Sequence, residues 1–232
     1  MIKRTLIFTS MTLLLTGCLS IPGIQKPSTT QPVEISPQHI EMVRALNSEE
    51  LSKLAERGDQ FAQYYLGNKY AQGAEVPQDM TKAKAYWEQS ANQGNGNALY
   101  NLGMSYFTGQ GSTKSFETAL NYFQRSAEAG NTRAALNAGS MLEQGQGAMV
   151  NLPLAAQFYQ RAVANQPHAA YRLGLLYTKN TADFPADYNQ AAQLFQQAAT
   201  QGDRFAPRAL NIIQNYPAEQ AADLLTRLSN SI

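Results

Sequence analysis

The stretch NALYNLGMSYFTGQGSTKSFETALNYFQRSAEAG, residues 97–130, contains one unit of a pattern that recurs along this chain. The unit ends at Gly130, which follows the equivalent Gly94 by 36 residues. The same slot is filled at the same interval by Gly58, Gln166 and Gly202. Self-similarity at a fixed period of this length predicts stacked supersecondary units rather than one irregular core.

Each unit begins with a segment that has the period of an amphipathic helix. In the quoted unit Ala98, Leu102 and Tyr106 are four residues apart, with Gly103 beside Leu102. Such spacing places them on one helical face, and the small residues let a partner helix approach closely. The predicted helix stops are Gly73, Gly109, Gly145 and Asn180, residue types that tolerate the left-handed conformation.

A second helix follows in each unit, and a short polar side chain marks its start. The candidate N-caps are Asp79, Ser115, Asn151 and Asp187, whose oxygens can accept a free backbone N–H. An aromatic residue follows each cap at Trp87, Phe123, Tyr159 and Phe195. The agreement of cap, aromatic residue and stop in one register predicts repeated helix pairs.

This recurring string resembles the Sel1-like repeat, a relative of the tetratricopeptide repeat, and the resemblance covers roughly residues 54 to 209 in four units. Both repeats are antiparallel helix pairs. Sel1-like units have a Gly-rich loop between their helices, as at residues 109–111. The resemblance implies an all-α, right-handed α-solenoid. Some secreted members of the family carry a disulfide in each repeat, which this chain lacks because Cys18 is its only cysteine.

The N-terminus has the pattern of a bacterial lipoprotein. Lys3-Arg4 precedes an apolar run, Thr5 to Thr16, that is shorter than the ~20 residues of a transmembrane helix and fits a signal peptide. Residues 15–18, Leu-Thr-Gly-Cys, resemble a lipobox, which makes Cys18 the predicted lipid attachment site. The alternative is an ordinary signal peptide with a chance cysteine. Because Leu19 rather than Asp follows the cysteine, the resemblance favours the periplasmic face of the outer membrane.

The predicted organisation has five parts. They are a lipoprotein signal peptide at 1–17, the lipidated cysteine and a Pro-rich tether at 18–37, an N-terminal helical cap at 38–57, the repeat solenoid at 58–204 and a C-terminal helical cap at 205–232. The tether contains a proline every five residues, and a spacer without a binding role is the favoured interpretation of it. The inner face of the C-terminal cap is predicted to consist of Ala221, Leu224, Leu225 and Leu228.

Little in the chain indicates catalysis or cofactor binding. The formal net charge is +1, without the basic face that nucleic acid requires. His39 and His168 are interpreted as two lone surface histidines, so no metal site is expected. The Gly-Gln-Gly loops superficially suggest a phosphate cradle, but no strand precedes them. We therefore expect no catalytic residues, no metal and no cofactor.

The face of the first helices opposite the packing face is the candidate binding surface. Its residues are Tyr64, Asn68, Tyr100, Met104, Phe107, Leu136, Ser140, Glu143, Tyr171 and Leu175. In tetratricopeptide-like solenoids this face lines the concave groove, and an exposed stripe of Tyr, Met and Phe is typical of a protein-binding surface. The alternative is that neighbouring first helices bury part of this stripe against each other.

These patterns predict a non-enzymatic, lipid-anchored periplasmic adaptor or scaffold that binds a protein or peptide in the cell envelope. By family resemblance, the candidate processes are secretion machines such as type VI, pili and cell-wall complexes. A regulator of a peptidoglycan-active enzyme or of a β-lactam response is the first alternative. A hydrolase with no visible catalytic constellation is the second.

Overall fold

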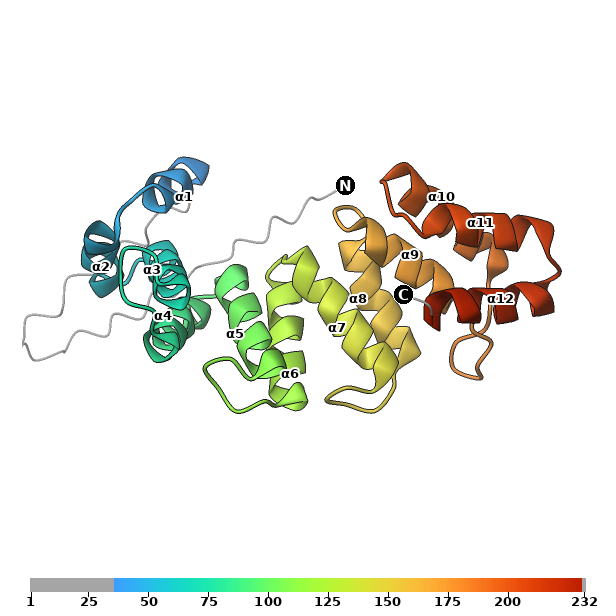
Figure 1. Ribbon diagram of the computed structural model, residues 1–232, viewed down its shortest axis with the longest axis horizontal. Helices are drawn as coiled ribbons and strands as arrows, with labels where there is room; N and C mark the ends of the chain where they lie inside the picture. Colours follow the sequence, from blue (N-terminus) through green and yellow to red (C-terminus); the bar gives the residue numbers. More distant parts are fainter. Residues whose placement is uncertain (1–35, 231–232) are drawn as a thin grey trace, which may run out of the picture. The chain divides into compact units, whose positions relative to one another are not determined.

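Twelve α-helices make up the regular structure of residues 36–230, the part of the chain that the computed structural model describes (Figure 1). They are α1 Pro37–Arg44, α2 Ser48–Glu56, α3 Gln60–Gln72, α4 Met80–Asn92, α5 Gly96–Thr108, α6 Phe116–Glu128, α7 Thr132–Gln144, α8 Leu152–Ala162, α9 Pro167–Leu176, α10 Tyr188–Thr200, α11 Ala206–Asn215 and α12 Ala218–Asn230. The predicted signal peptide, Cys18 and all of the predicted tether up to residue 35 lie outside the described residues. Across the described range, no helix is both long and apolar enough to cross a membrane.

The helices pack in chain order. From α2 to α12 each helix makes extensive contacts with the next one along the chain, and α1 packs on α3. An array in which each unit contacts mainly its neighbours is a solenoid. The prediction of an all-α solenoid of helix pairs is therefore confirmed.

The helix ends follow the predicted capping pattern in most repeats. The side chains of the predicted second-helix caps each accept a hydrogen bond from the backbone N–H three residues on; these caps are Asp79, Ser115, Asn151 and Asp187. Helices α3, α5 and α7 end at Gly73, Gly109 and Gly145, which have φ values of 69°, 86° and 72°. At these positions the left-handed backbone explains why glycine recurs.

Two positions in the predicted repeat register are wrong. Gln166 does not share the left-handed conformation of Gly130, because its φ of −131° makes it the extended N-cap of α9. The third unit is one residue short, so Gln166 occupies the cap position that Asn131 holds one unit earlier. Helix α9 also ends at Leu176 instead of continuing to Asn180, and the Thr178 hydroxyl donates a 2.7 Å hydrogen bond to the Leu175 carbonyl at this end. Such local side-chain bonds compete with helix propagation.

The predicted aromatic slot lies in the core of every repeat. The side chains of Trp87, Phe123, Tyr159 and Phe195 are all buried. Each ring packs directly on a helical glycine of the preceding helix, and the four glycines are Gly67, Gly103, Gly139 and Gly174. A Cβ atom added at any of them would lie 2.6–2.7 Å from a ring atom. The glycines are therefore required by the close approach of the ring.

Replacing one of these glycines tests the close packing. Gly103→Ala is expected to lower the free energy of unfolding by about 1–3 kcal/mol, because the new methyl group overpacks against the Phe123 ring. Urea denaturation followed by circular dichroism measures the change. The double variant Gly103→Ala/Phe123→Leu should recover part of the loss, since the two positions are in contact. Strictly additive effects would mean that the ring does not lie on this glycine.

The Gly-Gln-Gly loops serve contacts between repeats. A Cβ atom at Gly147 would lie 2.4 Å from the backbone oxygen of Phe116, at the start of α6 in the preceding unit. A Cβ atom at Gly111 would lie 3.0 Å from Met80 Cβ, at the start of α4, which is a looser contact. The second glycine of each loop therefore allows the backbone to approach the neighbouring repeat.

The two ends of the array are helical. Helices α1 and α2 precede the first repeat, and Val43, Leu51 and Ala55 are buried there with Ala62 and Leu66 of α3. Helices α11 and α12 follow the last repeat. Of their predicted inner face, Ala221, Leu225 and Leu228 are buried, and Leu224 is half-buried against the same core.

Candidate functional site

Three adjoining hollows run along the first helices of the first three repeats. The first has a volume of about 320 Å³ and is lined by residues that include Tyr64, Asn68, Asn101 and Met104. The second, of about 350 Å³, shares Tyr64 and Asn101 with the first. The third, of about 380 Å³, shares Tyr100 with the second and Met104 with the first. We call this continuous surface on α3, α5 and α7 the first-helix groove.

Most of the predicted stripe lies in this groove. The predicted residues that line it are Tyr64, Asn68, Tyr100, Met104, Phe107 and Ser140. All six are half-buried, and Tyr64, Tyr100, Met104 and Phe107 also pack against the hydrophobic core. Leu136 is also half-buried and packs against the core without lining a hollow. The six lining side chains are therefore accessible from the hollows, while neighbouring side chains cover part of each.

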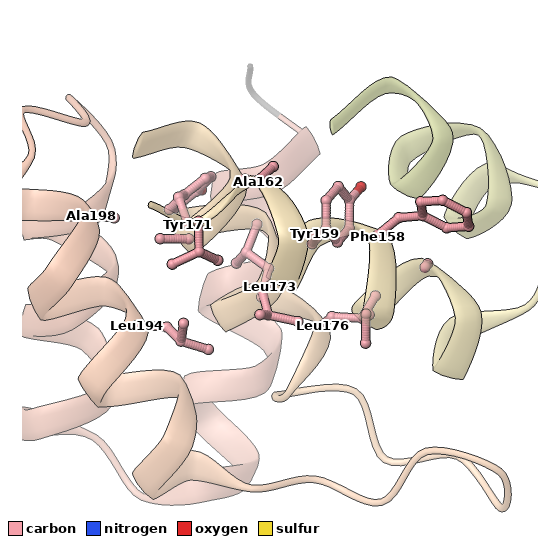
Figure 2. Close-up of a cluster of buried hydrophobic side chains, with 14 of the residues drawn as sticks. Phe158, Tyr159, Ala162, Tyr171, Leu173, Leu176, Leu194 and Ala198 are labelled. Atoms are coloured by element: carbon pink, nitrogen blue, oxygen red, sulfur yellow. The ribbon is translucent and has the colours of Figure 1, made fainter. Parts of the chain in front are cut away.

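The predicted stripe fails in the fourth repeat. Tyr171 is 0% exposed, and Figure 2 shows it within the cluster of buried side chains that includes Leu173 and Leu194. Its ring lies 5.8 Å from that of Phe205, which comes from the segment beyond the last repeat and covers this end of the array. Leu175 is buried as well. The placement of Tyr171 and Leu175 on an accessible surface is therefore wrong.

Glu143 also differs from its predicted exposure. Its side chain is only 7% exposed, and its carboxylate accepts hydrogen bonds from three groups of the third and fourth repeats. Oε2 accepts from Arg172 Nη2 at 2.7 Å and from the Tyr159 hydroxyl at 2.7 Å, while Oε1 accepts from Lys179 Nζ at 2.9 Å. Burial raises the pKa of Glu143, but Arg172, Lys179 and the Tyr159 hydroxyl together lower the pKa by more, so it lies below its ordinary value. We call these four residues the Glu143 cluster.

Amide side chains that sequence reasoning missed join the repeats along the groove. Asn101 Nδ2 donates a 2.8 Å hydrogen bond to Asn68 Oδ1, which also accepts one from Trp87 Nε1 at 3.0 Å. Asn137 Nδ2 lies 3.7 Å from Met104 Sδ. The available signal was positional, because Asn101 and Asn137 each lie two residues before the ring-contacting glycine of their helix.

The two histidines are paired and not lone, which corrects the sequence-based interpretation. His39 Nε2 lies 2.6 Å from Asp59 Oδ2, and His168 Nδ1 lies 3.1 Å from Asp203 Oδ2. The other oxygen of each aspartate accepts two backbone N–H groups at a helix start. These pairs therefore hold helix ends in place. In the part of the chain that the structure describes, no three His, Cys, Asp or Glu side chains are grouped so that they could hold a metal ion.

The helix pairs, the glycine–aromatic packing and the first-helix groove define the class of tetratricopeptide-like α-solenoids. The family model of the Sel1 repeat matches residues 60–95, 96–131, 132–166 and 167–203, and the chain belongs to the Sel1 repeat family. Sel1 repeats are scaffolds for protein–protein interaction and are generally non-catalytic.

Solved structures with the same fold support this assignment. The chain is similar to a Sel1 repeat protein from Oxalobacter formigenes, with 25% identity, a TM-score of 0.60 and coverage of 79% of this chain and 74% of that one. It is also similar to c5321, described as a protective antigen present in uropathogenic Escherichia coli strains and displaying an SLR fold. That match has 26% identity, a TM-score of 0.68 and coverage of 80% of this chain but only 41% of the other. No curated protein matches the chain.

Proposed function

We propose that this protein is a non-enzymatic adaptor that holds a segment of a partner protein in the first-helix groove. The observation that carries the proposal is the continuity of the three hollows, which share Tyr64, Tyr100, Asn101 and Met104 across three repeats. Aromatic and Met side chains offer apolar contact area, and the neighbouring amides can exchange hydrogen bonds with a peptide backbone. This combination suits an extended or helical polypeptide segment better than a small polar metabolite.

Two tyrosines of the groove provide the direct test. The double variant Tyr64→Ser/Tyr100→Ser removes aromatic contacts from all three hollows, and loss of an aromatic anchor from an interface can cost about 2 kcal/mol or more. We expect partner capture by in-cell crosslinking to fall at least about tenfold, while the helical circular dichroism spectrum and cooperative melting are retained.

The chain offers a matched control for this variant. Tyr86 and Tyr122 are also half-buried and also one repeat apart, but they lie on the second helices α4 and α6. Tyr86→Ser/Tyr122→Ser should cost similar stability and leave partner capture unchanged. If both double variants lose the partner equally, the loss reflects destabilisation and the groove is not the binding surface.

We further propose that the adaptor is tethered to the cell envelope through lipid on Cys18, at the periplasmic face of the outer membrane. The lipobox-like residues 15–18 and the Leu at position 19 support this location. Two or more acyl chains on one residue are needed for a stable anchor, since a single chain binds membranes only marginally. Among envelope processes, assembly of a secretion machine such as type VI, of a pilus or of a cell-wall complex fits an anchored adaptor.

The anchor is tested at its single cysteine. Cys18→Ser should abolish incorporation of labelled palmitate and release the protein from the membrane fraction. Ser20→Ala, which leaves the cysteine in place two residues away, should retain both the label and the membrane association. A Cys18→Ser protein that still takes up label would show that the lipoprotein assignment is wrong.

A further inference from the structure

The fourth repeat places two cations at positions that line the groove elsewhere. Because the third unit is one residue short, Arg172 is equivalent to Asn137, and Lys179 is equivalent to Gln144. Asn137 and Gln144 both line the third hollow. Glu143, which joins both cations to α7, directly precedes Gln144. The cations therefore lie where the repeat pattern continues the groove beyond α7.

These cations exceed the negative charge around them. Among the described residues, Glu143 is the only carboxylate within 4.0 Å of Arg172 or Lys179. The side chains of Arg172 and Lys179 are 19% and 42% exposed, whereas that of Glu143 is 7% exposed. The carboxylate therefore lies beneath the two cations, which keep donors facing solvent. Within 4.0 Å, therefore, two positive charges share one carboxylate among the described residues.

The only charge along the rest of the groove, among the described residues, is also positive. The linings of the three hollows include one charged residue, Arg133, which is exposed and makes no ion pair within residues 36–230. No acidic side chain lines any of the three. A ligand that follows the groove thus meets apolar and amide groups first and an excess of positive charge at the α9 end.

We infer that the segment bound in the first-helix groove carries a carboxylate, and that Arg172 and Lys179 bind this carboxylate at the α9 end. This inference rests on the proposed function and specifies the chemistry of its partner. Charge-assisted hydrogen bonds from Arg and Lys to a carboxylate are stronger than neutral ones, and Arg presents several donors in a fixed plane. Glu143 holds both cations in place before the ligand arrives, so little side-chain ordering remains to oppose binding.

The experiment selects ligands from a random-sequence synthetic peptide library, using the full chain purified in detergent. Bound peptides are identified by mass spectrometry, and the tightest are titrated by fluorescence anisotropy. We expect the selected peptides to be enriched in Asp and Glu or to require their C-terminal carboxylate. Their Kd should rise steeply with salt concentration, because the cations remain partly exposed.

Substitutions test whether Arg172 and Lys179 cause the preference for peptides that carry a carboxylate. Lys179→Gln leaves Glu143 paired with Arg172 and Tyr159, so it should fold and weaken binding about tenfold. Glu143→Gln/Arg172→Gln/Lys179→Gln removes all three charges together and should weaken it further. The control Lys53→Gln/Arg227→Gln removes one Lys and one Arg that each pair with one carboxylate on the exposed surfaces of α2 and α12, and it should bind normally.

The outcomes separate this inference from the function on which it rests. Peptides that require Tyr64 and Tyr100 but show no acidic enrichment, or bind Lys179→Gln as tightly as wild type, would overturn the inference and leave the adaptor proposal standing. Equal competition by phosphatidylglycerol vesicles or by DNA would also overturn it, since the cluster would then attract any anion. A failure to select peptides that depend on Tyr64 and Tyr100 would overturn both.

Discussion

Trp87→Ala is expected to lower the free energy of unfolding by about 3–5 kcal/mol, the usual cost of emptying a buried aromatic site. Trp87 is 5% exposed and packs with Ala83, Ala98 and Leu102, and its indole N–H donates to Asn68. The loss is a large fraction of the roughly 5–15 kcal/mol that stabilises an ordinary domain. Because repeats couple mainly to their neighbours, the N-terminal repeats should unfold before the others.

Urea unfolding followed by circular dichroism measures this effect, since the substitution removes the only tryptophan of the chain. Trp87→Phe is the matched control. Phe occupies the equivalent slot as Phe123 one repeat later, so it should retain most of the stability. An unfolding midpoint of Trp87→Ala within error of wild type would place the side chain outside the core and contradict the register of the repeats.

Glu143→Gln is the second large expected loss, at about 3 kcal/mol. Removing one member of a buried ion pair is costly because the partner's charge stays behind without compensation. Here Arg172 and Lys179 would both lose their carboxylate, and the Tyr159 hydroxyl would lose its charged acceptor. The surface pair Glu41–Arg44, with side chains 71% and 65% exposed, supplies the control. Glu41→Gln should change stability by less than about 1 kcal/mol.

The pH dependence of this loss of stability follows from the direction in which the fold shifts the pKa of Glu143. Because the pKa of Glu143 is lower in the folded chain than in the unfolded one, the carboxylate contributes stability above the unfolded pKa of about 4.3. That contribution is lost as the pH falls through the folded pKa. The difference in stability between wild type and Glu143→Gln should therefore be constant near neutral pH and shrink below pH of about 4. A difference that grows on acidification would contradict the ion-pair geometry.

The repeat period predicts local features well because each depends on a few neighbouring residues. The short polar side chain of Asp79 caps the helix that begins next to it. Gly109 ends helix α5 because the backbone there is left-handed. The aromatic slot at Trp87 follows from the same register. These features recur because the two helices of every unit pack against each other and against the neighbouring units in the same way.

The candidate site was harder to predict because its accessibility depends on residues in other units. Tyr171 matches Tyr100 in the pattern, yet Phe205 from beyond the repeats covers it. Glu143 is buried by Arg172 and Lys179 of the next repeat. In both cases the contacts that decide exposure come from residues outside the unit that contains the side chain.

Site-specific photocrosslinking in intact cells tests the central claim, that the first-helix groove holds the partner. A photoreactive residue is placed at Gln144, an exposed residue that lines the third hollow, or at Gln196, an exposed residue of the second helix α10. The account predicts a covalent adduct with a partner protein from position 144 and none from position 196. An equal or stronger adduct from position 196, or no adduct from position 144, would contradict it.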